Sequence, residues 1–161
     1  MQAPLSIEVV TTEGAALAQV RALFKAYLLE LNADLCFQQF DTELENPLKK
    51  YAPPTGALLL ARWNNEPVGC IAFQPLPEAG LYTCEMKRLF VLPTHRKLGI
   101  GEALVAQLLT MAKTAHYHTM VLDTLERLQP AIQLYQQFGF TVTTPYYHNP
   151  LQEVVYMQKV L

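Results

Sequence analysis

One stretch of this chain does most to decide its fold, and it reads Leu89-Phe90-Val91-Leu92-Pro93-Thr94-His95-Arg96-Lys97-Leu98-Gly99-Ile100-Gly101-Glu102-Ala103-Leu104. It is typical of the end of a strand, a loop with two cations and two glycines, and the start of a helix. Glycines let the backbone approach a ligand closely, and the free N–H groups of a helix start point toward anions. The stretch therefore predicts a site for a phosphate or pyrophosphate group.

Two known phosphate-binding motifs fit this stretch poorly. A Walker-type loop needs Gly-Lys-Ser/Thr, but Gly101 is followed by Glu102 and Ala103. A dinucleotide-binding fingerprint is closer, because Asp123 lies 22 residues beyond Gly101. However, Leu104 stands where the third glycine of that fingerprint belongs, and the loop is longer than its tight turn. A nicotinamide-dinucleotide domain stays open as an alternative, as does a helix start that binds nothing.

Hydrophobic patterns on both sides of the stretch predict the remaining elements. Helical spacing predicts a helix over 17–31 that Thr12 would cap, a weaker one within 34–50, and helices over 99–116 and 130–138. Strand-like runs cover 7–10, 57–63, 68–74, 81–91, 119–125, 140–144 and 154–160, with a hairpin turn at 64–67. This order predicts a single α/β domain over residues 1–161. We expect a mixed, mostly antiparallel twisted sheet of about six or seven strands with helices on both faces.

The composition restricts partners and location. The 161 residues include 12 Lys and Arg against 14 Asp and Glu, for a formal charge of −2. Without a basic excess, we expect no nucleic-acid partner and no membrane partner. Three cysteines cannot all pair, and we find no secretory start and no membrane-length apolar run, so we expect a cytoplasmic protein. Only 16% of residues are charged and 51% are hydrophobic, which predicts a homodimer surface in addition to a ligand slot.

Two motifs carry a resemblance to a known family. The pattern Arg96-x-x-Gly99-x-Gly101, after a strand that ends Val91-x-Pro93, resembles the acyl-CoA-binding motif of the GNAT superfamily of N-acetyltransferases. The pattern Ala131-x-x-Leu134-Tyr135-x-x-x-Gly139-Phe140 resembles the penultimate helix and turn of that family. The resemblance covers residues 57–145 well. It implies the GNAT fold and transfer of acetyl from acetyl-CoA to a primary amine of a small molecule or peptide, by direct attack in a ternary complex. A catalytically silent acyl-CoA-binding module is the alternative.

The resemblance also implies where the co-substrate binds. Main-chain amides of the loop would hold the CoA pyrophosphate, which assigns cofactor binding to Arg96, Lys97, Leu98, Gly99, Ile100, Gly101 and Glu102. The main chain at Leu89, Phe90 and Val91 would hold the pantetheine arm, beside a strand bulge that in the family splays two parallel strands. Family members often carry an Asn where this chain has Leu128, so we expect Asp123 or Thr124 to supply the missing contacts.

Glu85 and Tyr135 are the candidate catalytic residues. Some family members carry a catalytic Glu at the spacing of Glu85 from the loop, and a Glu in an apolar strand is costly unless it faces a cleft or is paired. Strand alternation puts Glu85, Lys87 and Leu89 on one face, so a structural pair between Glu85 and Lys87 is the alternative to a catalytic base. Tyr135 resembles the helix tyrosine that acts as general acid in the family. A core tyrosine with a satisfied hydroxyl is the alternative there.

Two aromatic segments predict the walls of the acceptor site. Tyr146 and Tyr147 lie in a turn-rich loop, and Phe37 lies in the N-terminal helical region that usually helps to form this wall in the family. We assign these three residues and Lys87 to substrate binding, with ordinary packing of loop against helix as the alternative. The four histidines form no ligand set, so we expect no metal.

Overall fold

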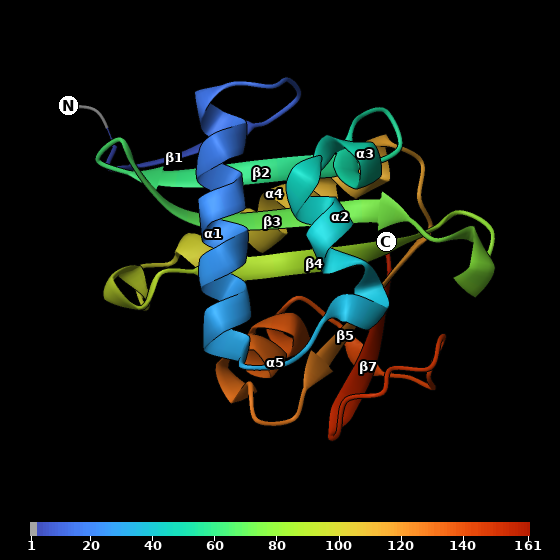
Figure 1. Ribbon diagram of the computed structural model, residues 1–161. Helices are drawn as coiled ribbons and strands as arrows, with labels where there is room; N and C mark the ends of the chain where they lie inside the picture. Colours follow the sequence, from blue (N-terminus) through green and yellow to red (C-terminus); the bar gives the residue numbers. More distant parts are fainter. Residues whose placement is uncertain (1–2) are drawn as a thin grey trace.

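Seven strands form one sheet at the centre of the molecule (Figure 1): β1 (Leu5–Val9), β2 (Ala57–Trp63), β3 (Glu66–Pro75), β4 (Thr83–Val91), β5 (Thr119–Leu125), β6 (Thr141–Val142) and β7 (Val154–Val160). This computed structural model describes residues 3–161, without the side chain of Phe37. The strand order is β1-β2-β3-β4-β5-β7-β6. Among the strands within residues 3–161, only β4 and β5 pair in parallel. The predicted mixed, mostly antiparallel sheet is confirmed.

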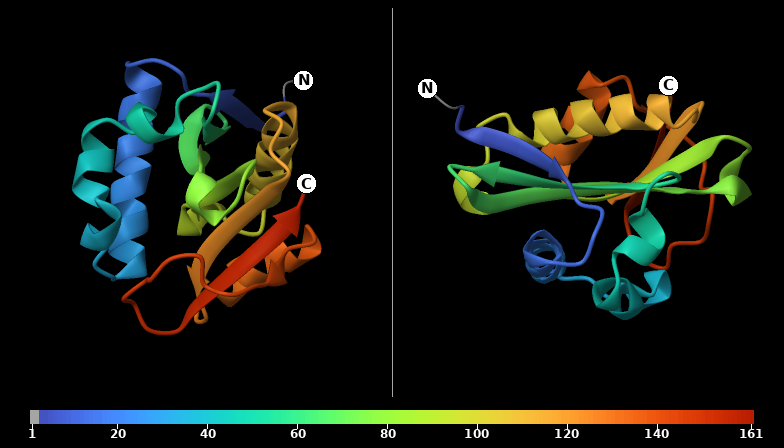
Figure 2. Two further views of the ribbon diagram at one scale, coloured as in Figure 1. Left: turned by 90° about the vertical axis from the view of Figure 1, so that its right-hand side faces the viewer. Right: turned by 90° about the horizontal axis from the view of Figure 1, so that it is seen from above.

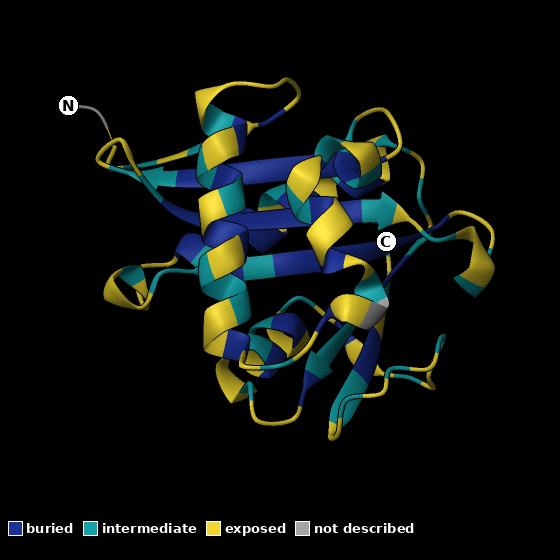
Figure 3. Ribbon diagram, in the orientation of Figure 1, coloured by how far each residue is buried: buried dark blue, intermediate teal, exposed yellow. Residues whose placement is uncertain are grey.

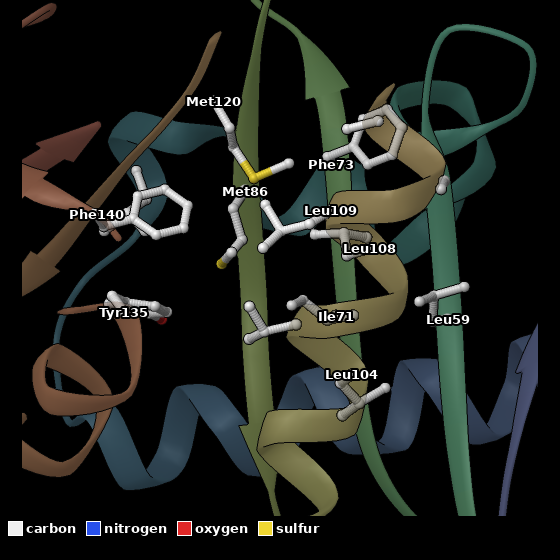
Figure 4. Close-up of a cluster of buried hydrophobic side chains, with 14 of the residues drawn as sticks. Leu59, Ile71, Phe73, Met86, Leu104, Leu108, Leu109, Met120, Tyr135 and Phe140 are labelled. Carbon is white, nitrogen blue, oxygen red and sulfur yellow. The ribbon is translucent and has the colours of Figure 1, made fainter. Parts of the chain in front are cut away.

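Helices cover both faces of this sheet, as Figure 2 shows. They are α1 (Ala15–Leu31), α2 (Phe40–Glu45), α3 (Leu48–Tyr51), α4 (Ile100–Thr114) and α5 (Gln129–Gln137), with short 3-10 turns η1 (Cys36–Gln38), η2 (Pro77–Ala79) and η3 (Pro93–His95). Helices α1, α2 and α3 lie on one face, and α4 lies on the other. The sheet separates two buried clusters, because alternate side chains of β2 and β3 enter opposite clusters. The central strands are accordingly buried (Figure 3), and Figure 4 shows the cluster under α4.

The N-terminal third differs most from the sequence prediction. Thr12 caps no helix, because α1 begins at Ala15 after Gly14, which makes no side-chain cap. The helix expected within 34–50 is broken into η1, α2 and α3. Gln39 takes the left-handed conformation at the first break, and Asn46 and Pro47 lie at the second. The strand expected over 140–144 is reduced to the two residues of β6.

A bulge in β4 changes which side chains share a face. Cys70 of β3 pairs with Phe90, but Ala72 pairs with Lys87, so β4 contains one residue more than β3 at this point. Arg88 takes a φ of 63° there. The extra residue shifts the alternation, and Leu89 packs with the cluster under α4. The prediction that Leu89 shares a face with Glu85 and Lys87 is therefore wrong, because that prediction assumed a regular strand.

Beyond the paired segment, β4 and β5 diverge. The two strands pair only from Thr83 to Glu85 and from Thr119 to Val121. From Met86 and Leu122 onward, neither strand has the other as a hydrogen-bonded neighbour. The sheet therefore opens in its middle, between its two halves.

A buried ion pair fixes the bulge to the α1 face. The Arg88 guanidinium donates to the Glu43 carboxylate from Nε at 2.7 Å and from Nη2 at 2.9 Å, and both side chains are almost fully buried. Arg88 Nη1 also donates to Gln38 Oε1 at 2.8 Å, and the guanidinium lies 4.8 Å from the centre of the Phe40 ring. Lys50 Nζ adds a contact to Glu43 Oε1 at 3.1 Å. These contacts hold η1 and α2 over the bulge.

Substituting Glu43 tests this pair. Burial by itself would raise the pKa of Glu43, but hydrogen bonds and charge from Arg88 and Lys50 outweigh burial and lower the pKa. A carboxylate with a lowered folded-state pKa stabilises the protein above its unfolded-state pKa, and this contribution is lost as the pH falls through the folded value. We expect Glu43→Gln to cost about 3–5 kcal/mol at pH 7, because Arg88 stays buried and uncompensated.

Urea unfolding measures this cost at several pH values. The difference between wild type and Glu43→Gln should shrink once the pH falls below about 4.3, the ordinary pKa of a glutamate. Glu13→Gln is the control, because Glu13 pairs with Arg21 at the surface and such pairs contribute about 0–1 kcal/mol. A Glu43→Gln protein as stable as that control would contradict the assigned role of the pair.

Candidate active site

A cavity occupies the gap where β4 and β5 diverge. Its walls include residues 86–89 of β4 and 122–125 of β5, both beyond the paired segment. The remaining walls come from α1, the segment around η1, α5 with the residue before it, and the C-terminal loop: Tyr27, Leu31, Leu35, Gln38, Leu128, Ala131, Tyr135, Asn149 and Leu151. Because the sheet opens here, residues of α1, β4, β5, α5 and the C-terminal loop all line the same cavity.

Some of the predicted site residues line this cavity and others do not. Lys87, Leu89 and Tyr135 line it, and so do Leu128 and both residues expected to replace the missing Asn, which are Asp123 and Thr124. Glu85, Tyr146 and Tyr147 do not line it. Glu85 lies 3.9 Å from Lys87, and the two tyrosines contact Glu85 and Asp123. Phe90 is buried in the cluster under α1, and Val91 packs on the other cluster. Phe37 belongs to η1, and its side chain lies outside the described part of the chain.

The loop before α4 presents unbonded amides. Gly99 precedes the first turn of α4 with a φ of 82°, a left-handed conformation that favours glycine. Within the described residues, the amides of 97–102 donate to no backbone carbonyl. Arg96 is half exposed and donates from Nε to the carbonyl oxygen of Val91 at 3.0 Å and from Nη2 to Glu30 Oε2 at 2.5 Å. Free amides, a helix start and the adjacent cations fit an anionic group such as the CoA pyrophosphate.

Tyr135 brings a protonated hydroxyl to the cavity. Its side chain is buried, and its ring lies 5.9 Å from that of Phe140 in an edge-on arrangement (Figure 4). Burial raises the pKa of the Tyr135 phenol, so the group keeps its proton at neutral pH. Within the described residues, the hydroxyl has no hydrogen-bond partner. Tyr135 is therefore a buried tyrosine with a free proton, and not one whose hydroxyl is occupied by the core.

Three charged side chains meet beside the cavity. Lys87 Nζ lies 3.9 Å from Glu85 Oε2 and 3.9 Å from Asp123 Oδ1, and all three side chains are at most 7% exposed. Burial lowers the pKa of Lys87, while the two carboxylates act in the opposite direction. The predicted pair of Glu85 and Lys87 is present, but Asp123 joins it. The sequence alone indicates Asp123 only as a cofactor contact, because no local signal shows that β5 brings it to β4.

The C-terminal loop covers both carboxylates. Tyr146 donates to Glu85 Oε2 at 2.6 Å, and Gln74 Nε2 donates to Glu85 Oε1 at 2.9 Å. Tyr147 donates to Asp123 Oδ2, and Asn149 Nδ2 donates to the same oxygen at 2.8 Å. The two tyrosines predicted to line an acceptor site therefore bind the carboxylates of Glu85 and Asp123.

This chain is similar to known acetyltransferases. Residues 19–140 match the model of the acetyltransferase (GNAT) family. An uncharacterised N-acetyltransferase of Schizosaccharomyces pombe is 47% identical over 139 residues, covering 86% of this chain and 84% of that protein. The chain belongs to the GNAT acetyltransferase family.

Solved structures share its fold. An acetyltransferase from Streptococcus agalactiae superposes with a TM-score of 0.81 at 22% identity, over 98% of this chain and 99% of that one. A GNAT family acetyltransferase from Elizabethkingia anophelis with acetyl-CoA bound gives a TM-score of 0.67 at 24% identity, over 99% and 100% of the two chains. Among residues 3–161, no helix is long and apolar enough to cross a bilayer, and no three His, Cys, Asp or Glu side chains are grouped to hold a metal.

Two glycine variants distinguish backbone strain at a positive φ from steric crowding of an added Cβ in this loop. We expect Gly99→Ala to lower the free energy of unfolding by about 1–2 kcal/mol, because an alanine is strained at this φ although nothing lies within 4 Å of its Cβ position. Gly101→Ala is the matched control, since its Cβ would meet Leu134 at an ordinary 3.4 Å without a positive φ. Chemical denaturation measures both variants, and equal stabilities would contradict the strained position of Gly99.

Proposed function

We propose that this protein transfers the acetyl group of acetyl-CoA to a primary amine of a small molecule or peptide, by direct attack in a ternary complex. The observation that carries the proposal is the opening between β4 and β5, whose walls include Tyr135, Lys87 and Asp123. Membership in the GNAT family supports use of a CoA thioester. We also propose, from composition, a cytoplasmic homodimer.

We propose that the co-substrate lies between the loop before α4 and the cavity. The free amides of 97–102, with Arg96 and Lys97, would bind its pyrophosphate. The main chain of residues 89–91 would align its pantetheine arm beside the bulge. When bound, acetyl-CoA supplies a thioester whose acetyl carbon is open to attack by an amine.

Tyr135 is the proposed general acid. As the amine nitrogen bonds to the acetyl carbon and the carbon–sulfur bond breaks, the Tyr135 hydroxyl gives its proton to the leaving sulfur and regains one from solvent. Its position on the cavity wall supports this role, because the hydroxyl has no other hydrogen-bond partner within the described residues and carries its proton at neutral pH.

Glu85 is the proposed base, and Asp123 brings the amine within its reach. Asp123 faces the cavity, so the acceptor ammonium meets it first. The proton then passes to Glu85 by way of Lys87, which gives a proton to Glu85 as it takes one from Asp123. Distances of 3.9 Å on each side of Lys87 must shorten for this transfer, as catalytic hydrogen bonds often do when substrate binds.

The proposed acid predicts a specific kinetic defect. We expect Tyr135→Phe to lower kcat by about 10²- to 10⁴-fold, the usual contribution of a general acid, with an unchanged Kd for acetyl-CoA. Steady-state kinetics and calorimetry measure the two quantities. Tyr82→Phe is the control, since Tyr82 is exposed away from the cavity. Unchanged turnover of Tyr135→Phe would remove this residue from the mechanism.

The proposed reaction is tested by thiol release from acetyl-CoA across a panel of primary amines. We expect amine-dependent release by wild type and a loss of about 10²-fold or more in Glu85→Gln, because that variant cannot hold the proton. Glu66→Gln, at an exposed strand position, should behave as wild type.

Two other results identify the alternatives. Tight CoA binding without turnover on any amine would favour the silent binding module. A thermal shift with NAD and none with acetyl-CoA would overturn the proposed function.

A further inference from the structure

The cavity contains two opposite charges that have no direct hydrogen bond. Lys87 Nζ and Asp123 Oδ1 are separated by 3.9 Å, too far for one to satisfy the other. Both side chains line the cavity, and both are more than nine-tenths buried. Within the described residues, neither of these two atoms makes a hydrogen bond, although both residues have charged neighbours, so the pair points to a ligand that bonds to both atoms.

The surrounding contacts show which atoms are left for that ligand. Both oxygens of Glu85 accept hydrogen bonds, from Gln74 and from Tyr146, and Asp123 Oδ2 accepts from Tyr147 and Asn149. Within the described residues, Asp123 Oδ1 has no donor within hydrogen-bonding distance. A lysine ammonium has three N–H donors, and both carboxylates lie 3.9 Å from Lys87 Nζ, beyond hydrogen-bonding distance. One oxygen of Asp123 and the N–H donors of Lys87 therefore remain for a ligand.

The charges around the cavity balance. Two ion-paired groups lie here, and together they hold three carboxylates and three cations: Glu85 and Asp123 with Lys87, and Glu43 with Lys50 and Arg88. A balanced buried set favours a ligand whose own charges cancel, because a net charge would enter the cavity uncompensated. A ligand with an ammonium for Asp123 and a carboxylate oxygen for Lys87 meets this requirement, whereas a carbonyl oxygen would bond to Lys87 but leave the ligand with one net positive charge.

We infer that the acceptor is an α-amino acyl compound, with its amine on Asp123 Oδ1 and an oxygen of its adjoining carboxylate or carbonyl on Lys87 Nζ. The amine and that oxygen sit on neighbouring carbons, so one small ligand can reach both protein atoms. The cavity walls also include Leu31, Leu35 and Leu151, and this apolar lining fits an aliphatic side chain. This inference rests on the proposed function, and it makes Lys87 and Asp123 specificity-determining residues.

Three matched amines test the inference: leucine, leucinamide and 3-methylbutylamine, which share an aliphatic end and differ in the oxygen. Their rates are compared as kcat/KM per unprotonated amine, which removes the difference in amine basicity. We expect wild type to prefer leucine, leucinamide or both over 3-methylbutylamine by about 100-fold, the value of a hydrogen bond to a charged group. Preference for leucine assigns a carboxylate, and preference for leucinamide assigns a peptide-type carbonyl.

Variants then connect the preference to Lys87. In Lys87→Met the preference should fall to about onefold, while Lys113→Met, at an exposed position of α4, should keep it. Asp123→Asn should slow all three amines alike and leave their ratio unchanged. Circular dichroism checks that each variant is folded, and the wild-type comparison stands without them.

Equal use of the three amines by wild type would overturn the inference and leave the proposed function intact. A preference that persists in folded Lys87→Met would also overturn it. Turnover of none of the amines in a wider panel would instead overturn the proposed function on which it rests.

Discussion

The structure depends on one extra residue in β4 and on the Arg88–Glu43 ion pair, which compensates the charge that this bulge buries. A bulge brings Lys87 and Arg88 to the same side of the sheet, where a regular strand would place only one of them. That puts a guanidinium in the interior, and its charge is compensated by Glu43 from α2. The same contact therefore joins the bulge of β4 to the position of α2.

From this contact, hydrogen bonds continue across the molecule. Gln38 accepts from Arg88 and donates to the Tyr147 hydroxyl at 3.0 Å, and Tyr147 donates to Asp123. One row of polar contacts thus connects the N-terminal helices, the centre of the sheet and the C-terminal loop. Because each group in the row is partly or fully buried, the row holds the walls of the cavity in one arrangement.

Local sequence signals predicted the parts of the fold that local physics determines. The bounds of β5 and β7 were predicted to the residue, because strand-like runs bounded by turns are local. The loop before α4 was also predicted, since its glycines and cations are neighbours in the chain. No local signal in the sequence predicts the bulge. An arginine with a positive φ is unusual, and Arg88 is held in this conformation by Glu43, which lies 45 residues away in the chain. The contact of Asp123 with Lys87 is likewise not predictable from local sequence, because it depends on the parallel pairing of β4 with β5.

The Arg88–Glu43 pair also limits how this chain can diverge in evolution. Loss of either member alone leaves a charge sealed in the interior, whereas joint replacement by apolar side chains of similar volume is far less costly. The path between two such sequences passes through a poorly folded intermediate unless both codons change together. Descendants of a common ancestor should thus inherit the two positions as a unit, although they lie 45 residues apart in the chain.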